Sequence, residues 1–241
     1  MPSVEEHYEQ VLADVYSWMA GGFEAAIARN REFFARHGIV PHGSRRAIDL
    51  GSGCGFQAIP LAAVGFSVTA IDTDRKLLEE LREHAGKADI AIVRDDLVGF
   101  DRLTAPDAEL IVCMVDTLLH LESKDRVLEL LAKVHAALED GGRFIVTFRD
   151  LSHELTELAR FIPVRSDDTT VFTCFLEFEP ETVKVHDLVY RRVADQWHFH
   201  KSFYRKLRLS RDWVETQLVN AGFDSLNVEV VNGFVTIVAT K

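Results

Sequence analysis

A glycine-rich loop between an apolar strand and a helix is the part of the sequence best suited to chemistry. The segment AIDLGSGCGF, residues 47–56, leaves a predicted strand, turns through Gly51, Gly53 and Gly55, and enters a predicted helix. Glycine tolerates positive φ and lets the backbone approach a ligand closely. The first N–H groups of the helix that follows have no partner inside it. The spacing therefore predicts a loop that holds part of a small ligand.

Two carboxylates near this loop indicate which ligand it favours. Asp72 ends the next predicted strand, where a carboxylate can accept hydrogen bonds from both hydroxyls of a ribose. Asp49, two residues before the first glycine, would repel a pyrophosphate and suits a cationic amino group instead. Phe56 also departs from the GxGxxG fingerprint, which needs glycine or alanine at that position. The loop favours a nucleoside with a cationic amino group over a dinucleotide, although an NAD-dependent oxidoreductase remains an alternative.

At these residues the chain resembles the class I S-adenosylmethionine-dependent methyltransferases, whose first motif is an acidic residue followed by GxGxG. The resemblance extends from about residue 45 to residue 241 and implies S-adenosylmethionine as the cofactor. It places five residues at the methionine moiety and the ribose. These are Asp49, Gly51, Gly53 and Gly55 at the methionine moiety, and Asp72 at the ribose.

The segment VRDDLVGF, residues 93–100, resembles the end of the third strand in the same family. This implies that Asp96 and Leu97 bind the adenine, with Asp95 as an alternative, while a helix cap is the other interpretation of both acids. Tyr8 and Tyr16 are candidates to close over the sulfonium through cation–π contact, and Tyr16 is the preferred lid residue. A protein that binds S-adenosylmethionine without turnover is a further alternative.

The end of the fourth predicted strand, VCMVDTLLHL at residues 112–121, is expected to face the cofactor and the methyl acceptor. In doubly wound sheets, ligands bind beyond the carboxyl ends of the strands. His120 is the candidate general base, because an imidazole with a pKa near ~6.5 can take a proton at neutral pH; a packing role is the alternative. The remaining candidates are Met114 at the cofactor, and Asp116, Thr117 and Arg149 in the acceptor pocket.

The elements that must position these residues alternate between short apolar strands and amphipathic helices. Such alternation predicts a doubly wound α/β fold with a mostly parallel sheet. The dipeptide Asn232-Gly233 predicts a terminal hairpin, and the resemblance implies seven strands with the last one reversed. The predicted strands are 47–50, 67–71, 90–93, 109–114, 143–148, 226–231 and 234–240. The predicted helices are 56–64, 74–86, 123–139 and 211–221, and the third of these is expected to end at a cap formed by Gly141 and Gly142.

Residues 1–241 are expected to form a single domain with four parts. Residues 1–42 form an N-terminal helical lid, and residues 43–150 form the cofactor-binding half. Residues 151–209 form an insertion, and residues 210–241 form the final helix and the hairpin. The insertion is expected to hold one helix with Leu151, Leu155 and Leu158, followed by an antiparallel β-meander with strands near 170–179, 183–191 and 197–209. In this insertion the chain resembles methyltransferases that act on small molecules.

Composition narrows the possible partners. Twenty-seven Lys and Arg against 38 Asp and Glu give a net charge of −11, which disfavours nucleic-acid binding. No apolar run approaches the ~20 residues that span a bilayer. The first residues, MPSVEEHYEQ, do not resemble an export signal. The three dispersed cysteines suit a reducing cytoplasm, where the protein is expected to be located. No metal site is expected, because His186, His198 and His200 without a nearby Cys or carboxylate pattern are weak evidence for zinc. The apolar alternation in the meander permits a homodimer.

Overall fold

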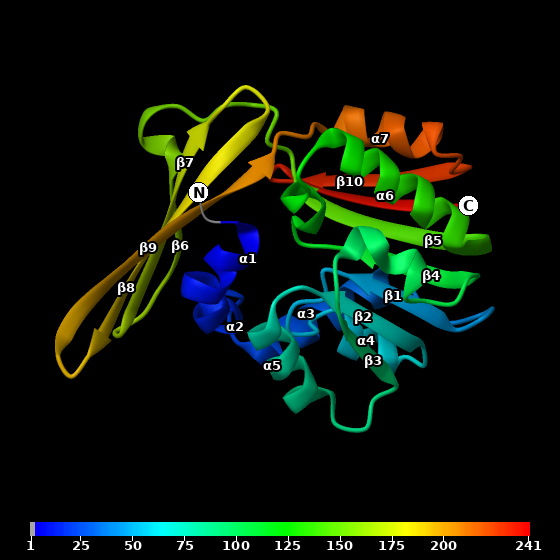
Figure 1. Ribbon diagram of the computed structural model, residues 1–241, viewed down its shortest axis with the longest axis horizontal. Helices are drawn as coiled ribbons and strands as arrows, with labels where there is room; N and C mark the ends of the chain where they lie inside the picture. Colours follow the sequence, from blue (N-terminus) through cyan, green and yellow to red (C-terminus); the bar gives the residue numbers. More distant parts are fainter. Residues whose placement is uncertain (1–2) are drawn as a thin grey trace.

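Seven strands form the main sheet in the order β10-β11-β5-β4-β1-β2-β3, in a computed structural model that describes residues 3–241 (Figure 1). The strands β3, β2, β1, β4 and β5 run parallel, whereas β11 runs antiparallel to both β5 and β10. This order confirms the predicted fold class, including the reversed last strand. The strands span Arg46–Leu50 (β1), Ser67–Asp72 (β2), Ile90–Arg94 (β3), Ala108–Cys113 (β4), Leu138–Arg149 (β5), Ser225–Val231 (β10) and Phe234–Thr240 (β11).

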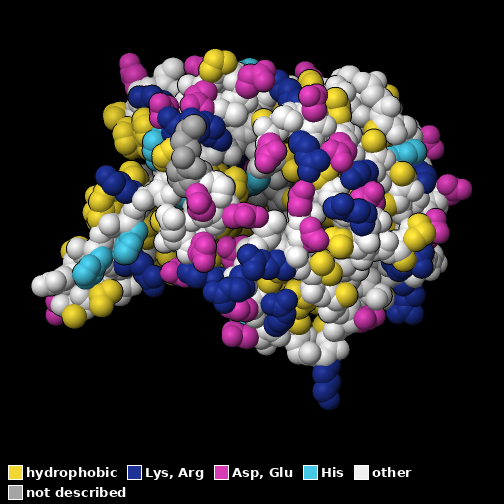
Figure 2. Space-filling model, viewed as in Figure 1, with side chains coloured by type: hydrophobic (Ala, Val, Ile, Leu, Met, Phe, Trp, Pro, Cys, Tyr) yellow, Lys and Arg dark blue, Asp and Glu magenta, His cyan; other side chains and the backbone are white. Residues whose placement is uncertain are grey.

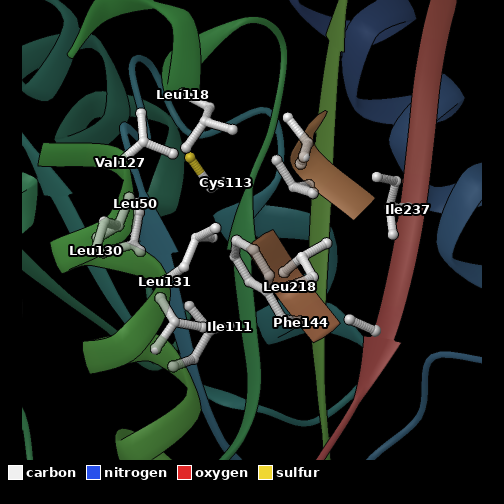
Figure 3. Packing of buried hydrophobic residues seen from close by; sticks show 14 of the residues in the cluster. Leu50, Ile111, Cys113, Leu118, Val127, Leu130, Leu131, Phe144, Leu218 and Ile237 are labelled. Carbon is white, nitrogen blue, oxygen red and sulfur yellow. The ribbon is translucent and has the colours of Figure 1, made fainter. Parts of the chain in front are cut away.

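Helices cover both faces of this sheet because its strands carry apolar side chains on both sides. Leu131 of α6 and Leu218 of α7 pack on one face around Phe144 (Figure 3), whereas Phe34 of α3 packs on the other face around Val112. Parallel strands buried on both faces are typical of doubly wound sheets. The helices span Phe23–Arg36 (α3), Ala58–Ala63 (α4), Arg75–Ala85 (α5), Lys124–Ala137 (α6) and Arg211–Asn220 (α7), and 3-10 turns span Leu97–Arg102 (η3) and Thr117–His120 (η4).

The paired glycines 141 and 142 do not cap α6, contrary to the prediction. The helix ends at Ala137 and β5 begins at the next residue, so both glycines lie inside the strand. Gly141 has φ +77°, and a Cβ at Gly142 would lie 2.8 Å from the Glu139 carbonyl oxygen. The register of β4 against β5 shifts beside them. The glycines therefore allow an irregular β5 to stay close to β4.

The insertion forms a second, four-stranded antiparallel sheet in the order β6-β7-β8-β9, which extends beside the main sheet (Figure 1). The predicted helix at its start is wrong: the segment contains only a 3-10 turn, Glu157–Arg160 (η5), followed by the additional strand β6. Leu158 is 83% exposed, so these leucines do not form a buried helical face. The strands are β6 (Phe161–Ser166), β7 (Thr170–Phe178), β8 (Thr182–Val193) and β9 (Gln196–Leu207).

The N-terminal segment, residues 3–20, lies between the two sheets (Figure 1). It is helical but irregular, and runs through α1 (Val4–His7), the π-helix η1 (Tyr8–Leu12), the 3-10 helix η2 (Ala13–Val15) and α2 (Tyr16–Met19). His7 is fully buried, and its Nε2 lies 2.7 Å from Asp187 Oδ2 on β8. This contact fixes the segment to the insertion. No helix in residues 3–241 is long and apolar enough to cross a membrane.

Candidate active site

A cavity of about 680 Å³ lies where the N-terminal segment, the carboxyl edge of the main sheet and the insertion meet. Its walls come from the loops after β1, β2, β3 and β4, from residues 3–16 and from β9. Figure 2 shows Asp and Glu side chains gathered around a hollow near the centre of this face of the molecule. The position agrees with the rule that doubly wound sheets bind ligands beyond the carboxyl ends of their strands.

The glycine loop forms the floor of one end of the cavity. A Cβ at Gly51 would lie 2.3 Å from Thr117 Cγ2, so a side chain cannot fit there, and Gly51 has φ +74°. Thr117 lines the cavity and donates its hydroxyl to the Met114 carbonyl at 2.8 Å. Gly53 also lines the cavity, with Tyr16 beside it. Glycine is required in this loop for its backbone conformation and for the close approach of the next loop.

The third glycine has a different function. Gly55 does not line the cavity, and a Cβ there would lie 2.2 Å from Leu81 Cδ1 on α5. The residue serves the packing of the loop on that helix. Phe56 is buried behind the loop, and its ring stacks on Tyr16 with centroids 5.8 Å apart. A bulky ring therefore fills the position where a dinucleotide fingerprint requires a small residue.

Asp72 lies at the end of β2 and faces the cavity. Its Oδ2 accepts the N–H of Gly53, and its Oδ1 accepts the N–H of Asp74, both at 2.8 Å. Burial raises the pKa of Asp72, and these two N–H groups oppose the rise. Each oxygen keeps a second lone pair, so the carboxylate is held in place and can still accept hydrogen bonds from two hydroxyls.

Two buried polar atoms near the loop have no protein partner. Asp49 Oδ2 and Ser52 Oγ make no hydrogen bond within the described residues, although their side chains are 1% and 2% exposed. Burial, and then the nearby Asp72, raise the pKa of Asp49 to about 8. A buried acid without a partner is costly unless a ligand supplies one. These atoms fit the cationic amino group of S-adenosylmethionine, either directly or through water.

Of the two acids after β3, Asp96 caps the turn that follows, and both Asp95 and Asp96 lie at the cavity. Asp96 caps η3 by accepting the Val98 N–H at 3.1 Å, and it pairs with Arg126 at 2.9 Å. Asp95, Asp96 and the half-buried Leu97 nevertheless all line the cavity. Capping uses only one lone pair of one carboxylate oxygen. Asp96 can therefore cap the turn and still reach a ligand, and Asp95 remains an alternative.

His120 lines the other end of the cavity between two tyrosines. Its ring is stacked on Tyr204 of β9, with centroids 5.3 Å apart and planes at 6°, and Tyr8 lies edge-on at 5.9 Å. Burial, and then the Lys206 cation, lower the pKa of His120 to about 3. Its Nδ1 is buried without a partner. The imidazole is therefore neutral at physiological pH and a weak base, which does not suit the general-base role expected from sequence.

Three other expected site residues do not line the cavity. Met114 is buried in the core between the sheet and its helices. The Asp116 carboxylate accepts the Arg149 N–H and the Lys206 ammonium, each at 2.7 Å, so it has partners on both oxygens. Burial alone would raise the pKa of Asp116, but the Lys206 and Arg149 cations hold it below its usual value. The Arg149 side chain is 64% exposed, and it lies outside the cavity lining.

The structure adds residues that the sequence could not assign to the site. Tyr204 and Arg205 of β9 line the cavity, and so does Arg126 of α6. Alternation along β9 separates its side chains into two faces, but the sequence does not show which face turns toward the cavity. His186 and His200 lie on opposite faces of the insertion sheet, because their strand partners are Phe203 and Val189. Within residues 3–241, no group of three or more His, Cys, Asp or Glu side chains is arranged to hold a metal ion.

Comparisons with known proteins agree with this geometry. Residues 47–142 match the family model described as a methyltransferase domain. A glycine/sarcosine N-methyltransferase from Aphanothece halophytica is 25% identical over 209 residues, which cover 85% of this chain and 75% of that protein. The CcbJ methyltransferase from Streptomyces caelestis has a TM-score of 0.77 at 21% identity over 96% of both chains. CalS10 from Micromonospora echinaspora, an amino pentose methyltransferase, has a TM-score of 0.65 at 16% identity over 95% of this chain and 93% of its own. The match identifies residues 47–142 as a methyltransferase domain, and the likeness to solved methyltransferases extends the same fold over nearly the whole chain.

Proposed function

We propose that this enzyme methylates the nitrogen of a small-molecule amine. The observation that carries the proposal is the state of the two side chains that might have removed a proton from an acceptor. His120 has a pKa of about 3, and both oxygens of Asp116 already accept hydrogen bonds. A hydroxyl acceptor needs a positioned base during the transfer itself, whereas an amine loses its ammonium proton to bulk water before it binds and then attacks with its own lone pair.

The binding roles in this proposal follow from the lining of the cavity. Gly51 and Gly53, which line the cavity, hold the methionine moiety, and Tyr16 closes over the sulfonium. Asp49 lies outside the lining and meets the amino group of the methionine moiety through water. Asp72 binds the ribose, while Asp96 and Leu97 bind the adenine. Bound in this way, S-adenosylmethionine supplies a methyl group whose leaving group is a neutral thioether.

The chain's own contribution to the transfer is mainly positioning, which can supply about 7–11 kcal/mol of a barrier. The neutral His120 lines the cavity, and because its Nδ1 is buried, its Nε2 is the ring nitrogen suited to accept a hydrogen bond from the acceptor N–H and so orient the nitrogen lone pair. Tyr8 and Tyr204 flank the imidazole and exclude water from this end. A concave cavity of about 680 Å³ suits a small acceptor better than a macromolecule. The N-methyltransferase named among the relatives supports the choice of nitrogen.

The test is methyl transfer from labelled S-adenosylmethionine to pairs of acceptors that differ only in a nitrogen or an oxygen, such as 1-aminopropane and 1-propanol. We expect transfer to the amine member of each pair. His120→Gln keeps a hydrogen-bond acceptor, so its pH profile should superimpose on that of the wild type. Preferential transfer to alcohols, together with a pH dependence that His120→Gln abolishes, would overturn the proposal.

A further inference from the structure

The charges around the cavity are unbalanced. Of the described residues that line it, six carry a carboxylate and two carry a guanidinium. Both guanidiniums are held by neighbouring acids. Arg126 bonds Asp96 at 2.9 Å, and Arg205 bonds Glu179 through two nitrogens at 2.7 and 2.9 Å. An acceptor carboxylate would therefore have to compete with a protein carboxylate for either cation.

Two of these acids differ from the rest because their carboxylates have no hydrogen-bond or ion-pair partner among the described residues. Glu5, on α1, and Glu122, in the loop that follows η4, are both exposed and both line the cavity. Neither side chain forms a hydrogen bond or an ion pair within residues 3–241. Because both residues are exposed and line the cavity, they leave two negative charges at its rim.

An independent feature inside the cavity points to the same kind of ligand. Tyr204 is only 6% exposed, yet its hydroxyl forms no hydrogen bond with any described residue, and the same holds for the hydroxyl of Tyr8. Both rings line the cavity next to His120. Neither hydroxyl is fully buried, so both can bond a polar ligand in the cavity, and the faces of tyrosine rings attract cations.

We infer that the acceptor is a small amine with a net positive charge and no carboxylate, such as a diamine. One nitrogen reacts beside Tyr8 and Tyr204, while an ammonium group stays near Glu5 and Glu122 at the rim. This inference rests on the proposed N-methylation and specifies its substrate class. A zwitterionic amino acid such as glycine is disfavoured, because its carboxylate would meet the two rim acids and only paired guanidiniums.

The first test compares acceptors that differ only in this charge. Glycine is compared with glycinamide, and 3-aminopropanoate with 1,3-diaminopropane, in the same transfer assay. We expect kcat/KM to be about tenfold higher for the cationic member of each pair. A factor of ten corresponds to about 1.4 kcal/mol, the combined effect of removing the repulsion of an acceptor carboxylate and of pairing an acceptor ammonium with a rim acid. A preference for glycine or 3-aminopropanoate would overturn the inference and leave the proposed N-methylation intact.

The second test assigns the preference to the rim. In Glu122→Gln and Glu5→Gln, KM for 1,3-diaminopropane should rise about two- to fivefold, the range of exposed ion pairs. The control is Glu83→Gln, an equal change of charge on the exposed side of α5 outside the cavity, and it should leave KM unaltered. Equal effects in the control and the rim variants would contradict a local role for Glu5 and Glu122.

Binding can be measured without any turnover. Calorimetry of the protein loaded with S-adenosylhomocysteine compares 1,3-diaminopropane with malonate, a dication with a dianion of the same chain length. We expect 1,3-diaminopropane to bind, and Glu122→Gln to weaken it by a similar factor. Binding of malonate instead, or no binding of the diamine, overturns the inference. Transfer to alcohols but not to amines overturns the proposed function itself, so the two failures can be distinguished.

Discussion

At the scale of single residues, we expect Asp49, whose Oδ2 is buried without a partner, to couple cofactor binding to proton release. Its pKa of about 8 means that about 0.9 of this carboxyl is protonated at pH 7 before the ligand arrives. A cationic amino group beside Asp49 favours the ionised form and should expel that proton. Calorimetric titration with S-adenosylmethionine in two buffers of different ionisation enthalpy should therefore give different apparent enthalpies.

The matched control for this prediction is Asp49→Asn, which keeps the shape of the side chain and cannot ionise. In this variant the apparent enthalpies in the two buffers should agree, and affinity for the cofactor should fall. If the wild type also gives the same enthalpy in both buffers, Asp49 does not face the amino group of the ligand.

His120 makes the stability of the protein sensitive to acid. In the unfolded chain its imidazole takes up a proton below about pH 6.5, whereas in the folded chain it stays neutral down to about pH 3. The unfolded state therefore binds more protons in this window, and stability falls as the pH falls. Between pH 7 and pH 5 the loss from this one group should be about 2 kcal/mol.

Urea unfolding at both pH values measures this effect when the wild type is compared with His120→Gln. The variant should lose about 2 kcal/mol less than the wild type between pH 7 and pH 5. An identical loss in both proteins would show that His120 titrates normally, and it would restore the residue as a candidate base.

At the scale of elements, the pair of Asp116 and Lys206 joins the loop after β4 to β9. The two side chains are 6% and 11% exposed, and their atoms are 2.7 Å apart. Removing one partner of a buried pair leaves an uncompensated charge, so Lys206→Met should cost about 3–5 kcal/mol in the free energy of unfolding. Combining it with Asp116→Asn removes both charges and should recover much of the loss.

The control for this prediction is the exposed pair of Lys124 and Glu181, whose atoms are 3.4 Å apart. Lys124→Met should change stability by about 0–1 kcal/mol, as is usual for surface pairs. If Lys206→Met costs no more than Lys124→Met, the buried pair does not hold the insertion to the main sheet.

This pair also marks the limit of prediction from the sequence. Local sequence patterns were sufficient to predict the strands and helices of the main sheet, because each strand and the helix that follows it have their own periodicity and caps. The choice of partner for Asp116 depends on Lys206, 90 residues later, and no local pattern encodes such a contact. For the same reason, the sequence did not show that Tyr204 faces the cavity. The helix predicted near Leu158 failed because spacing alone does not show whether a neighbouring surface exists to bury the leucines.

At the scale of the whole molecule, three separate parts enclose one cavity. In the proposed assignment the main sheet supplies the cofactor end, β9 supplies the acceptor end, and the N-terminal segment contributes a tyrosine to each. The N-terminal segment contributes Tyr8 and Tyr16 to the walls, so its attachment should control access to the site. Its buried link to the insertion is His7 with Asp187, whose Oδ1 also accepts the thiol of Cys174 at 2.9 Å.

Breaking this link should loosen the N-terminal segment without unfolding the sheet. In His7→Leu, Asp187 loses a buried partner, which should cost about 1–3 kcal/mol in the stability of the closed segment. Amide exchange in residues 3–20 should therefore become about 5- to 150-fold faster. Affinity for S-adenosylmethionine should fall as well, because Tyr16 is no longer held over the glycine loop. His7→Gln, which keeps a donor for Asp187, should restore both. Faster exchange throughout β1, β2 and β4 would instead mean global destabilisation, and unaltered exchange in residues 3–20 would mean that other contacts hold the segment closed.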